Sequence, residues 1–492
     1  MKIQKILGWV MVAGLGTIGA GCSDWLDVQP KDKQTEEQLF ATMEGFNSAV
    51  NGIYVSLGSD ALYGKNLSYE MLDILGKRYQ VNSKQDYFTQ LNAYNYSEKT
   101  VADQIQATWE KAYKVILNCN VILKNLEERR ENVVNEANYK LLRGELLGVR
   151  AFLHFDMLRM FGPVYKMDPQ AESIPYNESA SGEALPLLPA DSVIHFKIMR
   201  DLTEAESLLE NSDPVIAEGV LDSTRYEDPD NSMRYRQLRF NYYAVRLLKA
   251  RVLLYAEKPL EALEAALKII EDPVANEHFP AVDPTRLLAN ALTPDRMFST
   301  ECLLGLYNKD RNLIYRDRFN GESAGDNLLQ PREGFVDGSL FAGENQDYRF
   351  QSQWIQSATV GSPGLMLIKY RGIEDPDNDY FHGTFVSLMK ISEAWYIAAE
   401  AETDLNKAYE YLNDMRKRRG LQDLPVADKN QLMSRLRLEY IREFIGEGQV
   451  FFMYKRMYRE IVASENGYNT SVFAASTARY VLPLPESEIE NR

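Results

Sequence analysis

The sequence is poor in the residues that most often build metal and catalytic sites. Its three cysteines, Cys22, Cys119 and Cys302, show no metal-ligand spacing. Its four histidines are scattered along the chain: His154, His195, His278 and His382. No Gly-x-Ser-x-Gly, His-Glu-x-x-His, phosphate-loop or dinucleotide fingerprint occurs. We therefore expect no catalysis, no metal and no cofactor, while a bond between Cys119 and Cys302 after export stays open.

Basic residues are also in deficit, since 55 Lys and Arg face 71 Asp and Glu, a formal net charge of -16. A chain of this charge repels phosphate backbones, so nucleic acid is a poor partner. The acidic excess is spread over the whole sequence, which indicates solubility rather than a site. Aromatic residues are the informative excess, with 29 Tyr, 20 Phe and 5 Trp.

Long apolar runs are absent beyond the first residues of the chain. Lys2 and Lys5 precede an uncharged apolar run from Ile6 to Ala20. This run is shorter than the ~20 residues that a membrane-spanning helix needs, so it indicates a secretory signal. We predict a signal peptide over residues 1–21.

The end of this signal resembles a lipoprotein cleavage site. Small residues lead to Cys22, which is followed by the polar pair Ser23-Asp24. A plain signal cleaved elsewhere would leave Cys22 an ordinary residue. The polar residues favour acylation of Cys22, with 22–35 as a lipid-anchored tether, because buried acyl chains contribute ~0.8 kcal/mol per CH₂.

The rest of the chain is predicted to be mainly α. Apolar residues recur at steps of three and four, as in the series from Leu142 to Met160, and Gly162-Pro163 ends that helix. Asn135 and either Asp191 or Ser192 are expected to cap helices. The expected helices are Glu36–Leu57, Val101–Arg130, Asn135–Phe161, Asp191–Leu209, Asn241–Ala256, Glu261–Ile270, Val386–Glu402, Leu405–Arg419, Gln431–Gly446 and Val450–Ile461.

Two pairs of these helices resemble tetratricopeptide-type hairpins. The first lies within 243–273 and the second within 391–419, each with small alanines at packing positions. Generic antiparallel helix packing explains the same spacing. Between the pairs, residues 272–386 are rich in Pro, Gly, Asn and aromatic residues. Unstructured connections of that length are uncommon and usually carry function or strands. We divide the mature chain into 36–271, the insertion 272–386 and 387–492.

Several segments, taken in order, resemble the SusD/RagB family. They include RGELLGVRAFLHFDMLRMFGPV at 143–164, ISEAWYIAAEAE at 391–402, IREFIGEGQVFFMYKR at 441–456 and YVLPLPESEIENR at 480–492. The sequence departs from the family at Glu447-Gly448-Gln449 and near His382. The resemblance implies a SusD-like α/α fold with interrupted helical hairpins, a loop-rich ligand-binding portion and few short strands.

The resemblance also implies a role. Members of this family are lipid-anchored proteins of the outer membrane that capture nutrient oligomers at the cell surface for a TonB-dependent SusC-like transporter. It further implies that the matched motifs build the scaffold rather than the ligand site. We therefore expect Arg143, Arg150, Asp156 and Glu400 to pair across helices.

The ligand is expected to contact aromatic residues in loops, because a sugar ring presents an apolar face and a rim of hydroxyls. Two regions have suitable composition. The first, 58–99, contains Tyr63, Asn66, Tyr69 and Arg78, and its chosen candidates are Tyr79, Asn82, Asp86, Tyr87 and Tyr94. The second, within 272–386, contains Tyr307, Asn308, Arg311 and Phe319, and its chosen candidates are Tyr315, Phe335 and Trp354. Many of these rings must nevertheless belong to the core.

Two other functions remain open. A peptide-binding member of the same family would share the scaffold and differ in its ligand. A periplasmic helical-repeat adaptor would hold a protein partner in a concave groove and would lack the insertion 272–386. The insertion favours capture of a nutrient, for which we expect an oligosaccharide.

Overall fold

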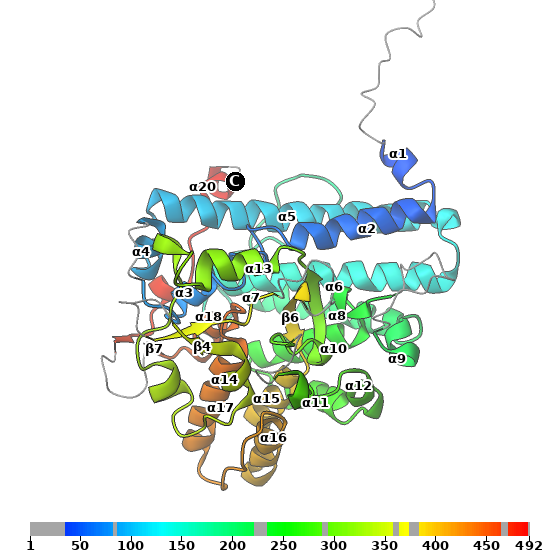
Figure 1. Cartoon of the computed structure of the whole chain (residues 1–492). Helices are drawn as coiled ribbons and strands as arrows, with labels where there is room; N and C mark the ends of the chain where they lie inside the picture. The colour runs from blue at the N-terminus through cyan, green and yellow to red at the C-terminus, as the bar shows by residue number, and fades with distance from the viewer. Residues whose placement is uncertain are drawn as a thin grey trace, which may run out of the picture.

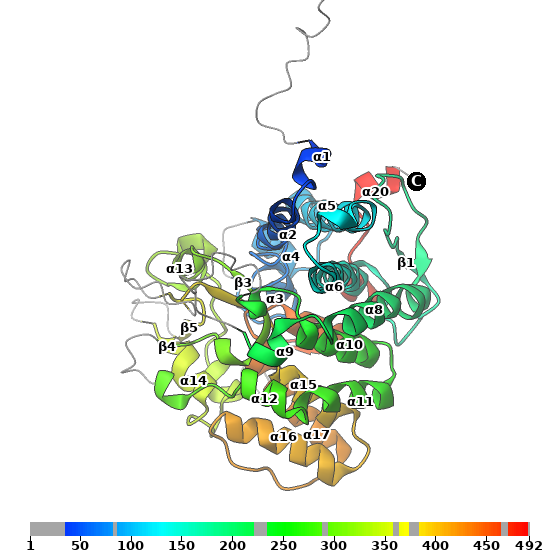
Figure 2. The same cartoon turned by 90° about the vertical axis from the view of Figure 1, so that its right-hand side faces the viewer.

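Helices arranged in successive layers form most of the chain, with a loop-rich segment along one flank (Figures 1 and 2). The structure is a computed structural model. It describes residues 35–81, 86–220, 234–287, 294–357, 364–372, 383–463 and 471–490.

The long helices α2, α5 and α6 run side by side and are seen nearly end-on in Figure 2. Helix α8 packs on α6, α10 on α8, and α11 pairs with α10 and packs on α15. The helices are α1 (Glu36–Leu39), α2 (Met43–Leu57), α3 (Met71–Leu75), α4 (Asp86–Asn92), α5 (Lys99–Glu128), α6 (Glu136–Phe161), α7 (Ala190–Ser192), α8 (Met199–Leu209), α9 (Pro214–Glu218), α10 (Tyr242–Tyr255), α11 (Pro259–Ile270), α12 (Pro273–His278), α13 (Arg311–Ile314), α14 (Tyr348–Gln353), α15 (Ser392–Ala401), α16 (Leu405–Arg418), α17 (Lys429–Phe444), α18 (Gln449–Met457), α19 (Thr477–Tyr480) and α20 (Glu486–Glu490).

Shorter elements fill the connections. The 3₁₀ turns are η2 (Arg130–Asn132), η4 (Arg236–Leu238), η5 (Pro284–Arg286), η6 (Ser299–Glu301) and η8 (Gly325–Asn327), and the π-helical turns are η3 (Val193–Ile198), η7 (Tyr315–Phe319) and η9 (Val336–Leu340). The strands of the described residues form four antiparallel pairs: β1 (Glu172–Ile174) with β2 (Leu188–Pro189), β3 (Cys302–Tyr307) with β6 (Phe385–Lys390), β4 (Trp354–Gln356) with β5 (Leu365–Leu367), and β7 (Ile461–Val462) with β8 (Val472–Phe473). The fold is mainly α, as the sequence predicts.

Helix ends follow the local sequence where a capping side chain is present. The side chain of Asn135 accepts a hydrogen bond from the backbone of Asn138, and that of Asn241 accepts one from Ala244. Thr42 starts α2 in the same way and divides the expected helix 36–57 in two. The expected cap at Asp191 or Ser192 is wrong, because α7 begins after Pro189 and neither α7 nor η3 has a capping side chain.

The helix predicted over 386–402 is also wrong in its first part. Residues 385–390 form β6, which is buried along its whole length and pairs with β3. A buried strand has no polar face and therefore no alternating pattern, so its apolar residues resemble a continuation of the helix that follows. The helix α15 begins only at Ser392.

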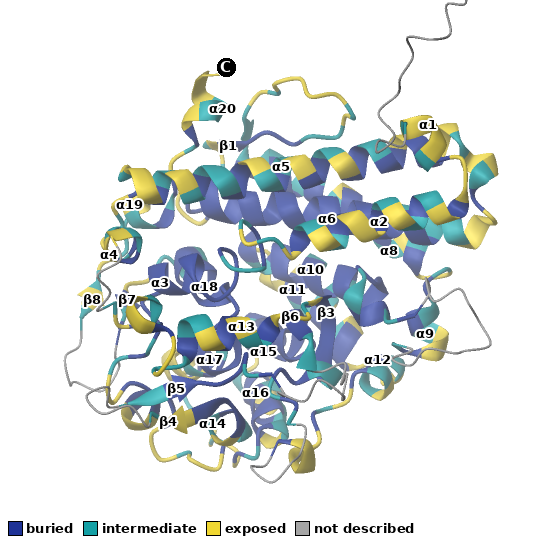
Figure 3. Cartoon of the chain, turned by 45° about the horizontal axis from the view of Figure 1, so that its top comes forward, coloured by how far each residue is buried: buried dark blue, intermediate teal, exposed yellow. Residues whose placement is uncertain are grey.

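Helix α6 lies at the centre of the upper layers and is buried on every side from Gly144 to Phe161 (Figure 3). Its polar residues therefore need partners inside the protein. Within it, His154 accepts a hydrogen bond at Nε2 from the backbone of Asn177, and its Nδ1 lies 2.8 Å from the carbonyl oxygen of Arg150. Burial lowers the pKa of His154 to about 3, so it stays neutral and serves the core.

The charged scaffold residues pair largely as expected. Arg143 bridges α6 to Glu127 of α5 at 2.7 Å and to α8 through Glu204 at 2.6 Å. Arg150 pairs with Asp201 of α8 at 2.7 Å. Glu400 of α15 pairs with Arg456 of α18 at 2.7 Å. Asp156 departs from the expectation, because its ion pair is with Arg159 of the same helix, although the Tyr63 hydroxyl donates to it from another segment.

Cys119 and Cys302 are both free thiols buried in the core. Cys119 lies in α5, whereas Cys302 begins β3 and contacts the hydroxyl of Ser387 at 3.1 Å. The open question of a disulfide is thereby decided in favour of two separate buried residues. Among the described helices, none is both long enough and apolar enough to span a bilayer.

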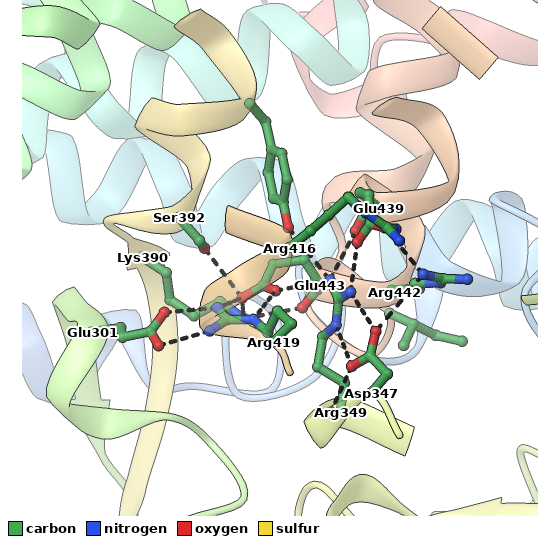
Figure 4. A network of polar contacts seen from close by, with 12 residues as sticks. Glu301, Asp347, Arg349, Lys390, Ser392, Arg416, Arg419, Glu439, Arg442 and Glu443 are labelled. Atoms are coloured by element: carbon green, nitrogen blue, oxygen red, sulfur yellow. Dashed lines mark hydrogen bonds and ion pairs between the residues drawn. The ribbon is translucent and has the colours of Figure 1, made fainter. Parts of the chain in front are cut away.

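A network of buried charges joins the insertion to the C-terminal helices (Figure 4). Glu443 of α17 accepts hydrogen bonds from Arg419 at 2.9 and 3.0 Å and from Ser392 at 3.1 Å. Arg419 also makes two bonds of 2.7 Å to Glu301, which precedes β3. The carboxylates and cations in this network alternate, so each buried charge has an opposite neighbour.

This network predicts sensitivity to acid. Burial alone would raise the pKa of Glu439, but Arg349, Arg442 and Arg416 outweigh it and lower that pKa to about 2. In the unfolded chain a Glu titrates near ~4.3. The stabilisation is therefore present above about pH 4.3 and lost as the pH falls toward 2. The free energy of unfolding in urea should therefore fall between pH 7 and pH 3. In Glu439→Gln it should depend less steeply on pH. An equally steep decrease in the variant would contradict the role given to Glu439.

Candidate functional site

A cleft opens where the first loop region meets the insertion. Its volume is about 580 Å³, which suits several sugar units or a short peptide. One wall is the end of α2 and the following loop, and the other is the end of β3 with α13 and η7. The lining residues are Tyr54, Val55, Gly58, Asp60, Gly64, Lys65, Tyr69, Tyr307, Asn308, Lys309, Asp310, Leu313, Ile314, Asp317 and Arg318.

The exposed aromatic ring of the cleft belongs to Tyr307, which is 56% exposed. It is the last residue of β3, and the five residues before it are buried. The strand thus emerges from the core at this ring. Val55 and Leu313 add exposed apolar surface to the same cleft. A flat ring beside apolar carbons can cover the C–H face of a sugar.

The polar groups of the cleft are balanced in charge. Arg318 Nε donates to Glu70 Oε2 at 2.6 Å, and Lys65 lies between Glu70 at 3.9 Å and Asp60 at 4.0 Å. Lys309 pairs with its neighbour Asp310 at 3.1 Å. Each described cation of the cleft therefore has a carboxylate partner. The cleft offers hydrogen bonds to hydroxyl groups without a strong field of either sign.

Stacked rings hold the two walls together. Phe319 of η7 stacks on Tyr370 with a centroid separation of 5.8 Å, and Tyr69 meets both rings edge-on at 5.9 and 5.2 Å. Below them, Asp73 accepts hydrogen bonds from the backbone of Gly446 and Gly448. Such packing fixes the loop that carries Lys65 and Tyr69 against the C-terminal helices.

Four of the chosen candidates lie in the core instead of the cleft. The Tyr79 hydroxyl donates to Asp73 at 3.0 Å, and Phe335 lies under the guanidinium of Arg78 at 5.2 Å. Tyr315 and Trp354 are also buried. Burial argues against direct ligand contact by these rings. They pack the insertion onto the helices, which is the usual fate of large apolar rings.

The other candidates have different surroundings. Asp86 is exposed at the start of α4 and accepts a hydrogen bond from Gln90 at 3.1 Å. Tyr87 is half-buried, and its hydroxyl is buried without a hydrogen-bond partner among the described residues. Tyr94 is half-buried, with its hydroxyl donating to Leu75 at 2.9 Å. Asn82 and Cys22 lie outside the described residues.

The two loop regions are nevertheless the ones that meet, and Tyr69, Tyr307 and Asn308 from them line the cleft. Sequence reasoning missed Tyr54, Val55, Asp60, Lys65, Leu313, Asp317 and Arg318. The short apolar run 302–306 was the available signal, since the end of a buried strand brings the next side chain to the surface.

A second hollow lies between α10, α15, α17 and α18, with a volume of about 40 Å³. It holds the ion pairs Arg251–Glu393 and Arg456–Glu400. Its size suits one or two waters and no sugar. Among the described residues, no cluster of three or more His, Cys, Asp or Glu is arranged to hold a metal ion.

Comparison with known proteins connects this chain to one family. A family model described as "Starch-binding associating with outer membrane" matches residues 24–214, and the model of the SusD family matches residues 351–492. The chain belongs to the SusD/RagB family. SusD-like protein P2 of Formosa agariphila is 26% identical over 170 residues, which cover 34% of this chain and 32% of the relative. SusD-like protein P25 of the same organism is 25% identical over 172 residues. The matched part is thus about a third of each SusD-like relative.

Solved structures of the SusD superfamily share the fold along nearly the whole chain. A SusD superfamily protein of Bacteroides vulgatus aligns with a TM-score of 0.71 and 20% identity over 92% of this chain and 97% of its own. A SusD-like carbohydrate binding protein of B. vulgatus aligns with a TM-score of 0.69 and 20% identity over 92% and 96%. This likeness shows the common SusD fold. Members of the family associate with the outer membrane at the cell surface.

Proposed function

We propose that this SusD-like protein binds a nutrient oligosaccharide in the cleft between residues 54–70 and 307–318 and releases it unaltered. The observation that carries the proposal is the exposed Tyr307 ring at the mouth of a charge-balanced cleft of about 580 Å³. A ring for the sugar face and paired polar groups for its hydroxyls are what such a ligand requires. The carbohydrate-binding relative of B. vulgatus supports the ligand class.

We further propose that acylated Cys22 anchors the protein to the outer membrane and that a TonB-dependent SusC-like transporter receives the ligand. Family membership supports both parts. A tether beside a transporter raises the effective concentration of the captured ligand, so modest affinity suffices. Co-purification from solubilised membranes should yield a barrel protein, and its consistent absence would contradict the partnership.

Calorimetric titration against matched panels of oligosaccharides and peptides tests the ligand class. We expect heat of binding with at least one oligosaccharide and none with peptides of similar size. Mass spectrometry of the recovered ligand should return its starting mass, because the protein performs no chemistry. Binding of peptides alone would replace this proposal with the peptide-binding alternative, and a cleaved ligand would contradict capture without chemistry.

A further inference from the structure

A cluster of cations surrounds two aromatic rings beside α4. The Lys77 ammonium lies 4.1 Å from the centre of the Tyr94 ring and 4.3 Å from that of Phe473. The Arg479 guanidinium lies 5.7 Å from the same Tyr94 ring. Arg332 reaches this place through Ser471, whose hydroxyl lies 3.3 Å from its Nη1. Three cations from distant parts of the sequence are thus gathered in one place.

None of these three cations has an ion pair with a carboxylate among the described residues. Lys77 donates to the carbonyl and side-chain oxygens of Asn92. Arg332 donates to Ser471, and Arg479 donates to the carbonyl of Ala474. Each cation of the cleft, in contrast, has a carboxylate neighbour. The cluster therefore differs in kind from the site described above.

Some donors of this region are buried without partners. The Nε of Arg332 makes no hydrogen bond in the described part of the chain. The same holds for Nη1 of the adjoining Arg78, a residue that is 1% exposed. A buried donor left without an acceptor destabilises the folded protein. Such donors are expected where a ligand supplies the acceptor.

The field of the cluster acts on its most buried member. Burial first, and then the charges of Arg332 and Arg479, lower the pKa of Lys77 to about 7. Lys77 is 2% exposed, whereas Arg332 and Arg479 are half-buried and reach solvent. Like charges gathered this closely repel one another, and a bound anion would relieve that repulsion.

The segment that carries Arg332 adjoins the cleft, because the backbone of Leu329 donates to the carbonyl oxygen of Arg318 at 2.6 Å. We propose that Arg332 and Arg479, with Lys77 behind them, bind an anionic group of the captured oligosaccharide. The group is a carboxylate or a sulfate, whose paired oxygens match the planar donors of arginine. The ligand class is therefore an acidic glycan, such as a uronate or a sulfated sugar. This inference rests on the proposed function and adds to it the charge of the ligand.

Calorimetry with three tetrasaccharides of equal length tests the inference: an oligogalacturonate, a sulfated galactan fragment and a neutral galactan fragment. We expect at least one acidic probe to bind about tenfold or more tighter than the neutral probe in low salt. Arg332→Gln and Arg479→Gln should each weaken binding of that acidic probe about tenfold or more, since each removes charge-assisted hydrogen bonds to the anion. Binding of the neutral probe should not change. Preference for one acidic probe separates a carboxylate ligand from a sulfate ligand.

Two matched variants control for folding and for general charge. Arg332→Lys keeps the positive charge and should retain more of the acidic affinity than Arg332→Gln. Arg130→Gln removes an exposed arginine that pairs with Glu136 elsewhere on the surface, and it should leave all three affinities unchanged. Equal losses for Arg130→Gln and Arg332→Gln would overturn the inference.

Other outcomes also decide between the two proposals. Neutral sugar bound as tightly as both acidic probes would overturn the acidic ligand and leave the proposed function standing. Acidic peptides bound in preference to every sugar, with the same sensitivity to Arg332 and Arg479, would overturn the glycan class. No sugar bound at any charge would overturn the proposed function together with the inference.

Discussion

Replacing Glu443 with glutamine is expected to destabilise the protein by about 3–5 kcal/mol. Glu443 is 1% exposed and faces Arg419, Arg349 and Lys390. The neutral side chain keeps the volume but leaves three buried cations with less negative charge. Removing one member of a buried ionic group lowers the stability by far more than the intact group contributes, because the remaining charges stay desolvated.

Guanidinium unfolding of the purified protein measures this loss as a shift in midpoint at unchanged slope. Asp103→Asn is the matched control, since Asp103 pairs with Lys99 at 2.9 Å on the exposed face of α5. Exposed pairs contribute ~0–1 kcal/mol, so the control should lie close to the parent. A Glu443→Gln variant as stable as Asp103→Asn would contradict the structural role of the network.

Replacing Tyr307 with alanine is expected to weaken binding of the captured oligosaccharide about thirtyfold or more. Truncating an aromatic residue at the centre of a binding interface typically weakens the binding free energy by ~2 kcal/mol or more. The stability of the protein should change by less than ~0.5 kcal/mol, because the ring is 56% exposed and packs little against the core. The two readouts separate a lost contact from a damaged fold.

Tyr307→Phe keeps the ring and should bind within a few fold of the parent, since the face of the ring carries the interaction. Ile355→Ala is a second control, because Ile355 is 40% exposed on β4 and does not line the cleft. Full loss in Tyr307→Phe would assign the role to the hydroxyl instead. Unchanged affinity in Tyr307→Ala would place the ligand elsewhere.

Most of the scaffold could be predicted from the sequence because its signals are local. The step of three and four residues in 142–160 and the cap at Asn135 each act within a few residues. The strand β6 could not be predicted in this way. Its six residues are buried by pairing with β3, whose residues lie 78 to 88 positions earlier, and a local pattern carries no record of that pairing.

The site was predictable by region and not by residue. Both regions chosen by composition, 58–99 and 272–386, supply walls of the cleft, while ligand binding by them stays a prediction. It could not separate Tyr307, which leaves the core at the end of β3, from Trp354 or Phe335, which stay inside. Whether a ring is exposed depends on whether a residue distant in the sequence packs against it, as Tyr370 packs against Phe319. The cluster of cations around Tyr94 could not be predicted for the same reason, because its members come from three separate segments.

Hydrogen–deuterium exchange with and without the tightest oligosaccharide of the panel tests the central claim most directly. Bound ligand should slow exchange of backbone amides in 54–70 and 307–318, the two walls of the cleft, while the hairpin α15–α16 exchanges as before. Protection confined to the helical hairpins, with no change in either wall, would contradict capture in this cleft.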